Sequence, residues 1–344
     1  IDPLEMAEKY GADALRFNLV TGNSPGNDMR FYTERCEAMR NFANKIWNAS
    51  RFVMMNLTID KCVLPGADQL APEDKWVLSK LNTLIKEVTE NLESYEIGVA
   101  SAKVYDFLWD TYCDWYIELT KSRLNGEDEQ AKLVAQNVLC YVLTELLKLL
   151  HPFMPFITEE IFQALPHEGK FIMTSQWPVY RPELDFPAEE SAMEAVMDTI
   201  KAIRARRAEM NVPPSKKAEV LIVTATPEVY AQGVHFIQRL AYASGVTFAE
   251  NAPADVTGMI SVVTHNATAY LPLSELVDIA AELERIAKEK TKAEENLARI
   301  EKKLQNESFV SKAPEAVVNA EREKADKARA LIAKLEESAA AMRD

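Results

Sequence analysis

Apolar residues recur at helical spacing over the first half of the chain. Between about residues 31 and 165 they return every three or four positions, in segments separated by polar, Gly or Pro breaks, as in amphipathic helices. Long helices with short joints are typical of an antiparallel bundle. The predicted helices are 31–57, 72–94, 98–123 and 127–150, with a shorter one after Pro152 and Pro155.

The hydrophobic period changes after a Pro-rich stretch at 166–190, which we interpret as a surface linker. The β-branched run at 218–225 suits a buried strand. Together with its neighbours it predicts a small α/β unit. Those neighbours are a helix at 189–210, a helix at 227–243, a strand at 246–249 and a hairpin of strands 259–264 and 267–271.

The tail from Ser274 to Asp344 follows a heptad pattern, which predicts a coiled coil. Because the joint at 306–314 is short, the two helices should fold back as an antiparallel hairpin. Lys290 is the one polar break in the first seam. The other seam positions are Leu276, Ile279, Leu283, Ile286, Ala293, Leu297, Ile300 and Leu304, then Val318, Ala325, Ala328, Ile332, Leu335, Ala339 and Met342.

Residues 1–30 predict two short helices and a loop rather than a complete unit. Asp2, Pro3 and Gly11 suit the cap, first turn and stop of the first helix. A second helix over 12–20 precedes a loop rich in turn-forming residues. We expect this segment to pack on something outside the chain.

A net charge of −14 argues against a polyanionic partner, because phosphate binding draws mainly on Lys and Arg. The charge is uneven, however, and two basic clusters could hold a polyanion that meets both. Ordinary solvated helix surface is the alternative explanation. The clusters are Arg30, Arg35, Arg40, Lys45 and Arg51, and Lys201, Arg204, Arg206, Arg207, Lys216 and Lys217.

Catalytic chemistry has little support in the sequence. The four His residues lack metal-ligand spacing, and no Gly-rich phosphate loop appears. His151, before Pro152, fits a core or cap histidine better than a general base. The four single cysteines favour a reduced, cytoplasmic protein without zinc or disulfides. No apolar run approaches the roughly 20 residues that span a bilayer, so we predict no catalytic residue, no metal and no membrane partner.

The helix predicted at 31–57 carries two different faces. One apolar face should point into the bundle: Met39, Phe42, Ile46, Ala49 and Val53. A second face combines amides, cations and one ring: Asn41, Asn44, Lys45, Asn48, Arg51 and Phe52. Proteins recognise single-stranded RNA loops with such combinations. Two alternatives stay open, namely a solvated surface and packing of Phe52 inside the bundle.

At this helix the chain resembles a known family. The run from Arg40 to Phe52 resembles the anticodon-binding domain of valyl-tRNA synthetases. Residues 1–17 resemble the segment after the Lys-Met-Ser-Lys-Ser loop of class I synthetases for valine, isoleucine and leucine. Residues 207–217 resemble the joint after the valyl anticodon domain, and 309–324 the turn of its C-terminal arm. The resemblance runs along the whole chain in the expected order.

The resemblance implies a mainly α fold that binds tRNA(Val) as a monomer. It implies a division into the tail of a class I catalytic domain at 1–30, an anticodon-binding bundle at 31–188, a small α/β unit at 189–273 and a tRNA-binding arm at 274–344. Lys45, Asn48, Arg51 and Phe52, with Asn44 beside them, would meet the anticodon loop. Arg299, Arg322 and Arg329 of the arm would meet the tRNA elbow.

From the chemistry of the side chains at the anticodon loop we also predict a role for each of them. Lys45 and Arg51 would contact phosphates, Asn48 a base edge and Phe52 a base face. Attachment of valine with ATP and Mg²⁺ would belong to the full-length enzyme, because the His-Ile-Gly-His-type motif and the Lys-Met-Ser-Lys-Ser loop are absent from this sequence. We therefore expect no cofactor and no catalysis in this chain by itself.

Two rival interpretations remain. The chain could be a non-enzymatic coiled-coil interaction module, which explains the heptads but leaves the stripe from Asn44 to Phe52 unused. It could also be the equivalent part of an isoleucyl-tRNA synthetase, although a C-terminal Cys-rich zinc module is missing. Binding of purified tRNA(Val) against total tRNA would separate these interpretations.

Overall fold

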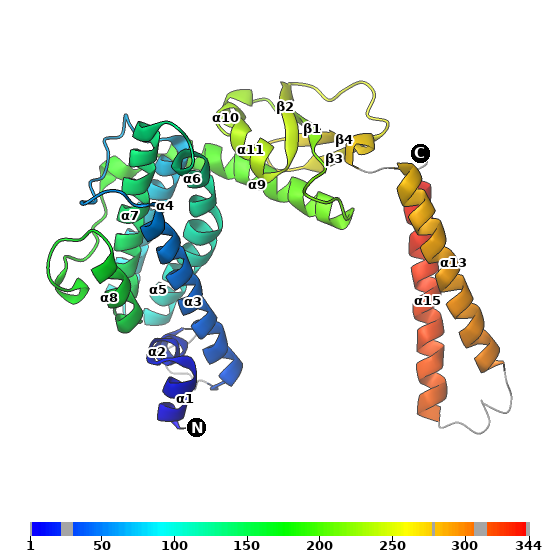
Figure 1. Cartoon of the computed structure of the whole chain (residues 1–344), viewed down its shortest axis with the longest axis horizontal. Coiled ribbons are helices and arrows are strands. Elements are labelled where there is room, and N and C mark those ends of the chain that lie inside the picture. Colours follow the sequence, from blue (N-terminus) through cyan, green and yellow to red (C-terminus); the bar gives the residue numbers. More distant parts are fainter. Residues whose placement is uncertain (1, 22–29, 277–278, 306–314, 342–344) are drawn as a thin grey trace. The chain divides into compact units, whose positions relative to one another are not determined.

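The computed structural model describes residues 2–21, 30–276, 279–305 and 315–341, and it divides into two units (Figure 1). The first unit covers residues 1–194 and the second 195–344. The division falls inside one helix, α9 (Pro187–Glu209), six residues after the boundary expected from sequence. Most of the loop at 21–28 and the whole joint at 306–314 lie outside the described residues.

The first unit is the predicted bundle of long helices. Its central helix, α7, begins at the cap residue Asp128, whose carboxylate accepts 3.0 Å hydrogen bonds from the backbone N–H groups of Gln130 and Ala131. Most of its later residues are buried among the other helices. The bounds are α3 (Thr33–Asn56), α4 (Pro72–Glu93), α7 (Glu129–Leu150) and α8 (Pro155–Ala164), followed by the 3₁₀ turns η2 (Ile172–Thr174) and η3 (Pro182–Leu184).

The helix predicted at 98–123 is continuous but differently wound. It consists of α5 (Ile97–Asp106), the π-helical segment η1 (Phe107–Tyr116) and α6 (Ile117–Leu124). A π-helix closes hydrogen bonds between residues five apart and is rare in proteins. The winding changes which side chains share a face in the middle of this element.

The N-terminal helices pack on the bundle, contrary to the expectation that their partner lies outside the chain. They are α1 (Pro3–Tyr10) and α2 (Ala12–Val20). The Phe17 ring lies 5.4 Å from that of Phe42 on α3. The Asp13 carboxylate accepts a 2.7 Å hydrogen bond from the backbone N–H of Ile157 at the start of α8. Burial raises the pKa of Asp13.

A buried charge network joins α4 to α6. Arg123 donates 2.6 Å and 2.8 Å hydrogen bonds to the two carboxylate oxygens of Asp74. Its Nε lies 2.8 Å from the Glu73 carboxylate. The Tyr116 hydroxyl donates a 2.6 Å hydrogen bond to Asp74. Because both carboxylates are almost fully buried, Arg123 is the cation that makes their burial tolerable.

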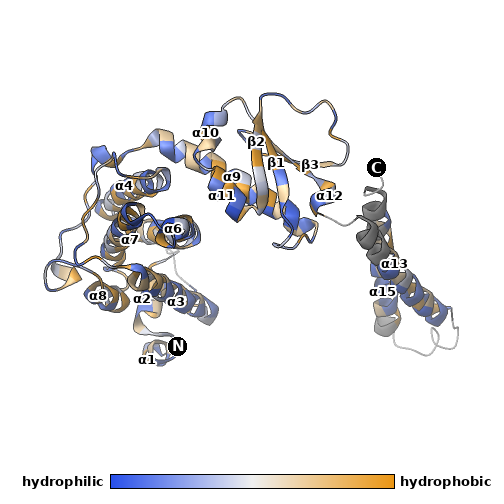
Figure 2. Ribbon diagram, turned by 45° about the horizontal axis from the view of Figure 1, so that its top comes forward, coloured by the Kyte–Doolittle hydropathy of each residue, from blue (hydrophilic) through white to orange (hydrophobic). Residues whose placement is uncertain are grey.

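The second unit contains a four-stranded sheet in the order β2-β1-β4-β3. Strand β1 pairs in parallel with β2 and antiparallel with β4, and β3 pairs antiparallel with β4. Ala218, Val220 and Ile222 of β1 are buried, and Figure 2 shows hydrophobic residues along β1 and β2. The bounds are β1 (Ala218–Val223), β2 (Ala243–Ala249), β3 (Met259–Val263) and β4 (Thr268–Pro272), with the short α12 (Leu273–Leu276) after them.

The helix predicted at 227–243 is divided into α10 (Pro227–Ala231) and α11 (Val234–Leu240). Gly233 stands at the break and packs so closely on Val196 of α9 that a Cβ there would lie 2.5 Å from the valine side chain. Only glycine fits this approach. Strand β2 starts at Ala243, earlier than the expected 246.

The tail forms the predicted helical hairpin of α13 (Ile279–Leu304) and α15 (Glu315–Ala341) (Figure 1). Three ion pairs cross between the helices: Lys290 to Glu336 at 2.7 Å, Glu301 to Arg329 at 2.7 Å and Lys303 to Glu321 at 3.2 Å. Partner numbers fall on α15 as they rise on α13, so the helices are antiparallel. The buried seam residues of the hairpin are Ala293, Ile300, Val318, Ala325 and Ala328, whereas the buried Leu276 belongs to α12. The side chains of Ile279, Leu283, Ile286, Leu335, Ala339 and Met342 lie outside the described residues.

Candidate nucleic-acid interface

Helix α3 separates its residues into the two predicted faces. Phe42, Ile46 and Val53 are buried in the bundle, with Met39 and Ala49 partly buried beside them. On the opposite side, Asn44, Asn48 and Arg51 are exposed. Their spacing of four and three residues places all three on one side of an α-helix. This α3 face, defined by Asn44, Asn48 and Arg51, offers amide and guanidinium groups to a partner.

Phe52 lies at the edge of the α3 face and is half-buried. The Lys121 ammonium of α6 lies 5.6 Å from its ring centroid, within the range of a cation–π interaction. One part of the ring therefore packs on the bundle and another part is open to solvent. This position is compatible with stacking on a base, and it also gives the ring a packing role.

Lys45, predicted to contact phosphates, has partners within the bundle. Its ammonium lies 2.6 Å from the Asp114 carboxylate and 3.7 Å from the centroid of the Trp109 ring. Only 24% of its side chain is exposed. Both partners come from η1. Lys45 is thus held against a neighbouring element rather than extended into solvent.

An aromatic column lies behind this lysine. The Trp109 ring stacks on Tyr105 at 5.7 Å and on Phe42 at 6.3 Å. Phe42 in turn stacks on Phe17 of α2 at 5.4 Å. Each contact is within the distance range of favourable aromatic pairs. The column fixes the orientation of Trp109 and with it the surface that Lys45 covers.

The first basic cluster is partly engaged in contacts of its own. Arg40 pairs with Glu37 at 3.0 Å, and its guanidinium lies 5.6 Å from the centroid of the Tyr10 ring. Arg35 lies 5.4 Å from the centroid of the Tyr32 ring. Arg30 and Arg51 are exposed. The positive charge available to a partner near α3 is therefore smaller than the residue count indicates.

In the second basic cluster, Arg207 is not a surface residue. It is 4% exposed and donates hydrogen bonds to the carbonyl groups of Pro213 and Lys216. Burial lowers its pKa. Including Arg207 in a basic face was wrong, because this side chain closes the turn after α9. Arg204, Lys216 and Lys217 are exposed, and Arg206 pairs with Glu209 at 3.0 Å.

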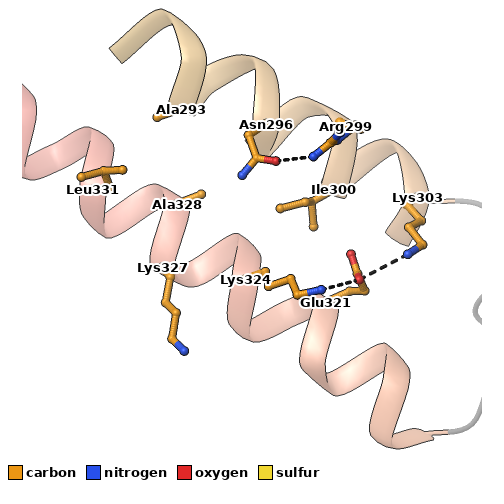
Figure 3. Close-up of a pocket in the computed structure, with 10 residues that line it drawn as sticks. All are labelled: Ala293, Asn296, Arg299, Ile300, Lys303, Glu321, Lys324, Lys327, Ala328 and Leu331. Atoms are coloured by element: carbon orange, nitrogen blue, oxygen red, sulfur yellow. Dashed lines mark hydrogen bonds and ion pairs between the residues drawn. The ribbon is translucent and has the colours of Figure 1, made fainter. Parts of the chain in front are cut away.

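The arm carries a groove of about 550 Å³ between its two helices (Figure 3). The floor is apolar and the rim is mainly basic, and Figure 3 shows Glu321 between Lys303 and Lys324. Hydrogen bonds from these two cations lower the pKa of Glu321. The lining residues are Ala293, Asn296, Arg299, Ile300, Lys303, Glu321, Lys324, Lys327, Ala328 and Leu331.

The three arginines predicted to meet the tRNA elbow have different surroundings. Arg299 lines the groove and donates a 2.9 Å hydrogen bond to Asn296. Arg329 joins the two helices through Glu301 and also pairs with Asp326 at 2.8 Å. Arg322 is exposed. The groove brings Arg299 together with lysines that sequence reasoning did not single out.

The histidines and candidate metal ligands can be located among the described residues. In the part of the chain that the structure describes, no three His, Cys, Asp or Glu residues gather as metal ligands. His151 Nδ1 lies 2.7 Å from the Thr158 hydroxyl, and burial lowers its pKa. This placement agrees with the interpretation of His151 as a structural histidine at a helix end.

Helix α7 is, among the described helices, the one long and apolar enough to cross a membrane by length and composition. The sequence interpretation that no apolar run approaches this length therefore needs correction. Of its most apolar window, 78% is buried inside the protein. Its hydrophobic residues form the centre of the bundle, as in core helices generally.

Sequence reasoning missed four residues around the α3 face. Trp47 is 39% exposed and Met55 is 80% exposed, and both are apolar residues that helical spacing could have assigned to this side. Trp109 and Asp114 lie more than sixty positions away from Lys45 in sequence, so only the fold reveals their contact.

Two protein families match this chain. Residues 74–222 match the anticodon-binding domain of tRNA ligase, and residues 278–343 match the valyl tRNA synthetase tRNA binding arm. Among solved structures, a LeuRS–tRNA–LeuAMS ternary complex from Agrobacterium radiobacter covers 54% of this chain and 22% of its own, with 20% identity and a TM-score of 0.41. A methionyl-tRNA synthetase from Mycobacterium tuberculosis has a TM-score of 0.40.

Related sequences are valine–tRNA ligases from bacteria. That of Clostridium acetobutylicum is 50% identical over 348 residues, covering all of this chain and 39% of the relative. The alignment with the ligase of Clostridium perfringens shows 52% identity and covers 96% of this chain and 38% of the relative. The alignment with the ligase of Bacillus subtilis shows 43% identity and covers 94% of this chain and 37% of the relative. The chain therefore spans less than two fifths of the length of these relatives.

Proposed function

Because this chain belongs to the family of bacterial valine–tRNA ligases and corresponds to their C-terminal part, we propose that it binds tRNA(Val) in the cytoplasm as a monomer. The α3 face meets the anticodon loop. The arm meets the tRNA elbow. The proposal rests on one observation above all: three polar side chains stand exposed on one side of α3, next to a half-buried ring, in an otherwise closely packed bundle.

Each group on the α3 face suits a different part of an RNA loop. The amides of Asn44 and Asn48 both donate and accept hydrogen bonds, which suits the edges of unpaired bases. Arg51 suits a phosphate. Phe52 offers the open part of its ring to one base. We assign discrimination to Asn48 and Phe52, and general affinity to Arg51.

The arm contributes affinity through phosphates. Its groove is lined by Arg299 and Lys303 of α13 and by Lys324 of α15, although Glu321 neutralises part of this charge. Arg322 adds an exposed cation, whereas Arg329 is engaged between the helices. Single substitutions at Arg299 or Arg322 should weaken the binding of all tRNAs alike. They should also reduce the dependence of the binding constant on salt concentration by about one phosphate contact.

Valine activation with ATP and Mg²⁺, as the name of the relatives implies, is proposed to take place outside these 344 residues. The chain alone should therefore give no valine-dependent pyrophosphate exchange above background. Such exchange would contradict this part of the proposal.

The decisive experiment is a filter-binding titration of the chain with purified tRNA(Val), total tRNA and a tRNA(Val) whose anticodon is exchanged for that of an isoleucine tRNA. Preference for tRNA(Val) that is lost on anticodon exchange supports the proposal. Equal binding of all three tRNAs would reduce the chain to a general polyanion binder. No binding would favour a coiled-coil interaction module, and preference for the isoleucine anticodon would favour the isoleucyl alternative.

A further inference from the structure

Lys45 is the residue of the proposed anticodon site whose surroundings are most closely defined. Its side chain crosses from α3 to η1, where it meets a carboxylate at 2.6 Å and an aromatic face at 3.7 Å. A lysine ammonium on a solvent-facing helix normally samples many rotamers, and its ordering has an entropic cost. Here the two contacts select one position before any partner arrives.

The winding of η1 explains why both contacts come from one short segment. Trp109 and Asp114 are five residues apart. In an α-helix with 3.6 residues per turn, that spacing would turn their side chains about 140° away from each other. In a π-helix, hydrogen bonds join residues five apart and place them one above the other. The π-helical winding of η1 (Phe107–Tyr116) therefore puts the ring and the carboxylate on the side that faces α3.

The two partners act on the ammonium in different ways. Trp109 attracts the cation through its ring face without neutralising it, and the column through Tyr105 and Phe42 keeps the ring in place. Asp114 is 51% exposed, so it compensates the charge of Lys45 at the surface and competes with any phosphate that approaches. Lys45 is consequently a poor general phosphate binder but a well-placed hydrogen-bond donor.

We propose that Trp109 and Asp114 are positioning residues for Lys45, and that η1 thereby contributes to the selection of tRNA by the α3 face. This inference rests on the proposed function. Asp114 suppresses non-specific phosphate contacts of Lys45. It also holds the Lys45 ammonium where the anticodon loop of tRNA(Val) meets it. Pre-ordering of this kind favours the partner that fits and penalises others.

The first test compares two carboxylates on η1. Asp114→Asn removes the charge that pairs with Lys45, whereas the control Asp110→Asn removes an exposed charge one turn earlier on the same segment. Both variants should bind total tRNA somewhat more tightly because each removes one negative charge. Only Asp114→Asn should lower the ratio of tRNA(Val) to total-tRNA affinity, by about two- to fivefold.

The second test asks whether Asp114 acts through Lys45. In a Lys45→Met background, Asp114→Asn should change the affinity ratio by less than a quarter of its effect in the wild type, since its partner is gone. Trp109→Leu should lower the ratio without tightening binding of total tRNA, and Trp109→Phe should restore most of it. Melting temperatures measured on the same proteins exclude an effect of unfolding.

A third measurement needs no tRNA. If the ammonium stays over the indole, ring current should shift the Lys45 ε-methylene resonance upfield in the NMR spectrum, and Trp109→Leu should abolish that shift. A Lys45 resonance at the ordinary lysine position in the wild type would overturn the inference. So would equal affinity ratios in Asp114→Asn and Asp110→Asn when the wild type discriminates. Absence of discrimination in the wild type would instead overturn the proposed function and the positioning role together.

Discussion

At the scale of single residues, Glu73 is a carboxyl group that the fold removes almost completely from water. Its pKa is raised to about 7 from the ordinary value of 4.5, because the effect of burial, to which the adjacent Asp74 adds, exceeds the opposing effect of Arg123. The folded protein therefore retains a proton that the unfolded chain loses above pH 4.5. The free energy of unfolding consequently falls as the pH rises from about 4.5 to about 7 and is level above that range.

Replacing Glu73 by Gln should remove this pH dependence. The amide keeps an oxygen for Arg123 but carries no charge to desolvate, so the free energy of unfolding at pH 8 should rise by about 1–3 kcal/mol over the wild type. Urea titrations between pH 4.5 and pH 8 measure it. The control Glu90→Gln, on the exposed side of α4, should retain the slope. A wild-type protein whose stability does not fall over this range would contradict the assignment.

A substitution of Phe52 tests whether its ring stacks on a base or packs in the bundle. Because its ring is half-buried, Phe52→Ala should weaken tRNA(Val) binding by about 1–3 kcal/mol through lost stacking and lower the melting temperature by a few degrees. Both quantities are measured on one protein. Unchanged affinity in a folded mutant would end the stacking hypothesis and leave Phe52 as a packing residue.

The sequence identified the α3 face but not what surrounds it. A helical wheel places Asn44, Asn48 and Arg51 together because their spacing alone determines the side they occupy. It cannot show that Lys45 meets Asp114, since that contact depends on how α3 and η1 pack. Arg207 illustrates the same limit: a basic residue in a basic run is buried because the following turn folds over it.

At the scale of elements, the hydrophobic pattern predicted most helices within a few residues but not their winding. Apolar residues are frequent on every side of 98–123, so the pattern predicts this segment as one regular helix and does not show that η1 is wound differently. The divided helix at 227–240 depends on a single close approach of Gly233 to Val196. Such contacts between distant residues do not change the hydrophobic periodicity of the sequence, so the pattern cannot predict them.

The arm offers an element-scale prediction at its polar seam residue. Lys290 pairs with Glu336 and Glu294, and a polar seam residue fixes register and oligomeric state at some cost in stability. Lys290→Leu should therefore stabilise the arm against urea but allow concentration-dependent dimers in sedimentation experiments. The control Lys292→Leu, on the exposed side of α13, should stay monomeric. A wild-type dimer would contradict the proposed monomeric state.

At the scale of the whole molecule, the chain comprises two units with cores of their own. We expect two transitions in a calorimetric scan, because each unit buries its own set of apolar residues. Leu146→Ala in α7 should lower the unfolding free energy of the first unit by about 2–5 kcal/mol, and Ile222→Ala in β1 should lower that of the second unit by a similar amount. Each substitution should therefore lower the temperature of one transition only. A single transition that both substitutions lower equally would show that the units unfold together.

The division of the chain between residues 194 and 195 also separates its tryptophans unequally between the two units. All five tryptophans precede that point, so selective indole fluorescence reports on the first unit alone, while the second is spectroscopically silent at those wavelengths. An emission change on addition of tRNA would originate in the bundle, and an acceptor dye attached to the arm would receive energy only from donors in the other unit. The five natural fluorophores are Trp47, Trp76, Trp109, Trp115 and Trp177.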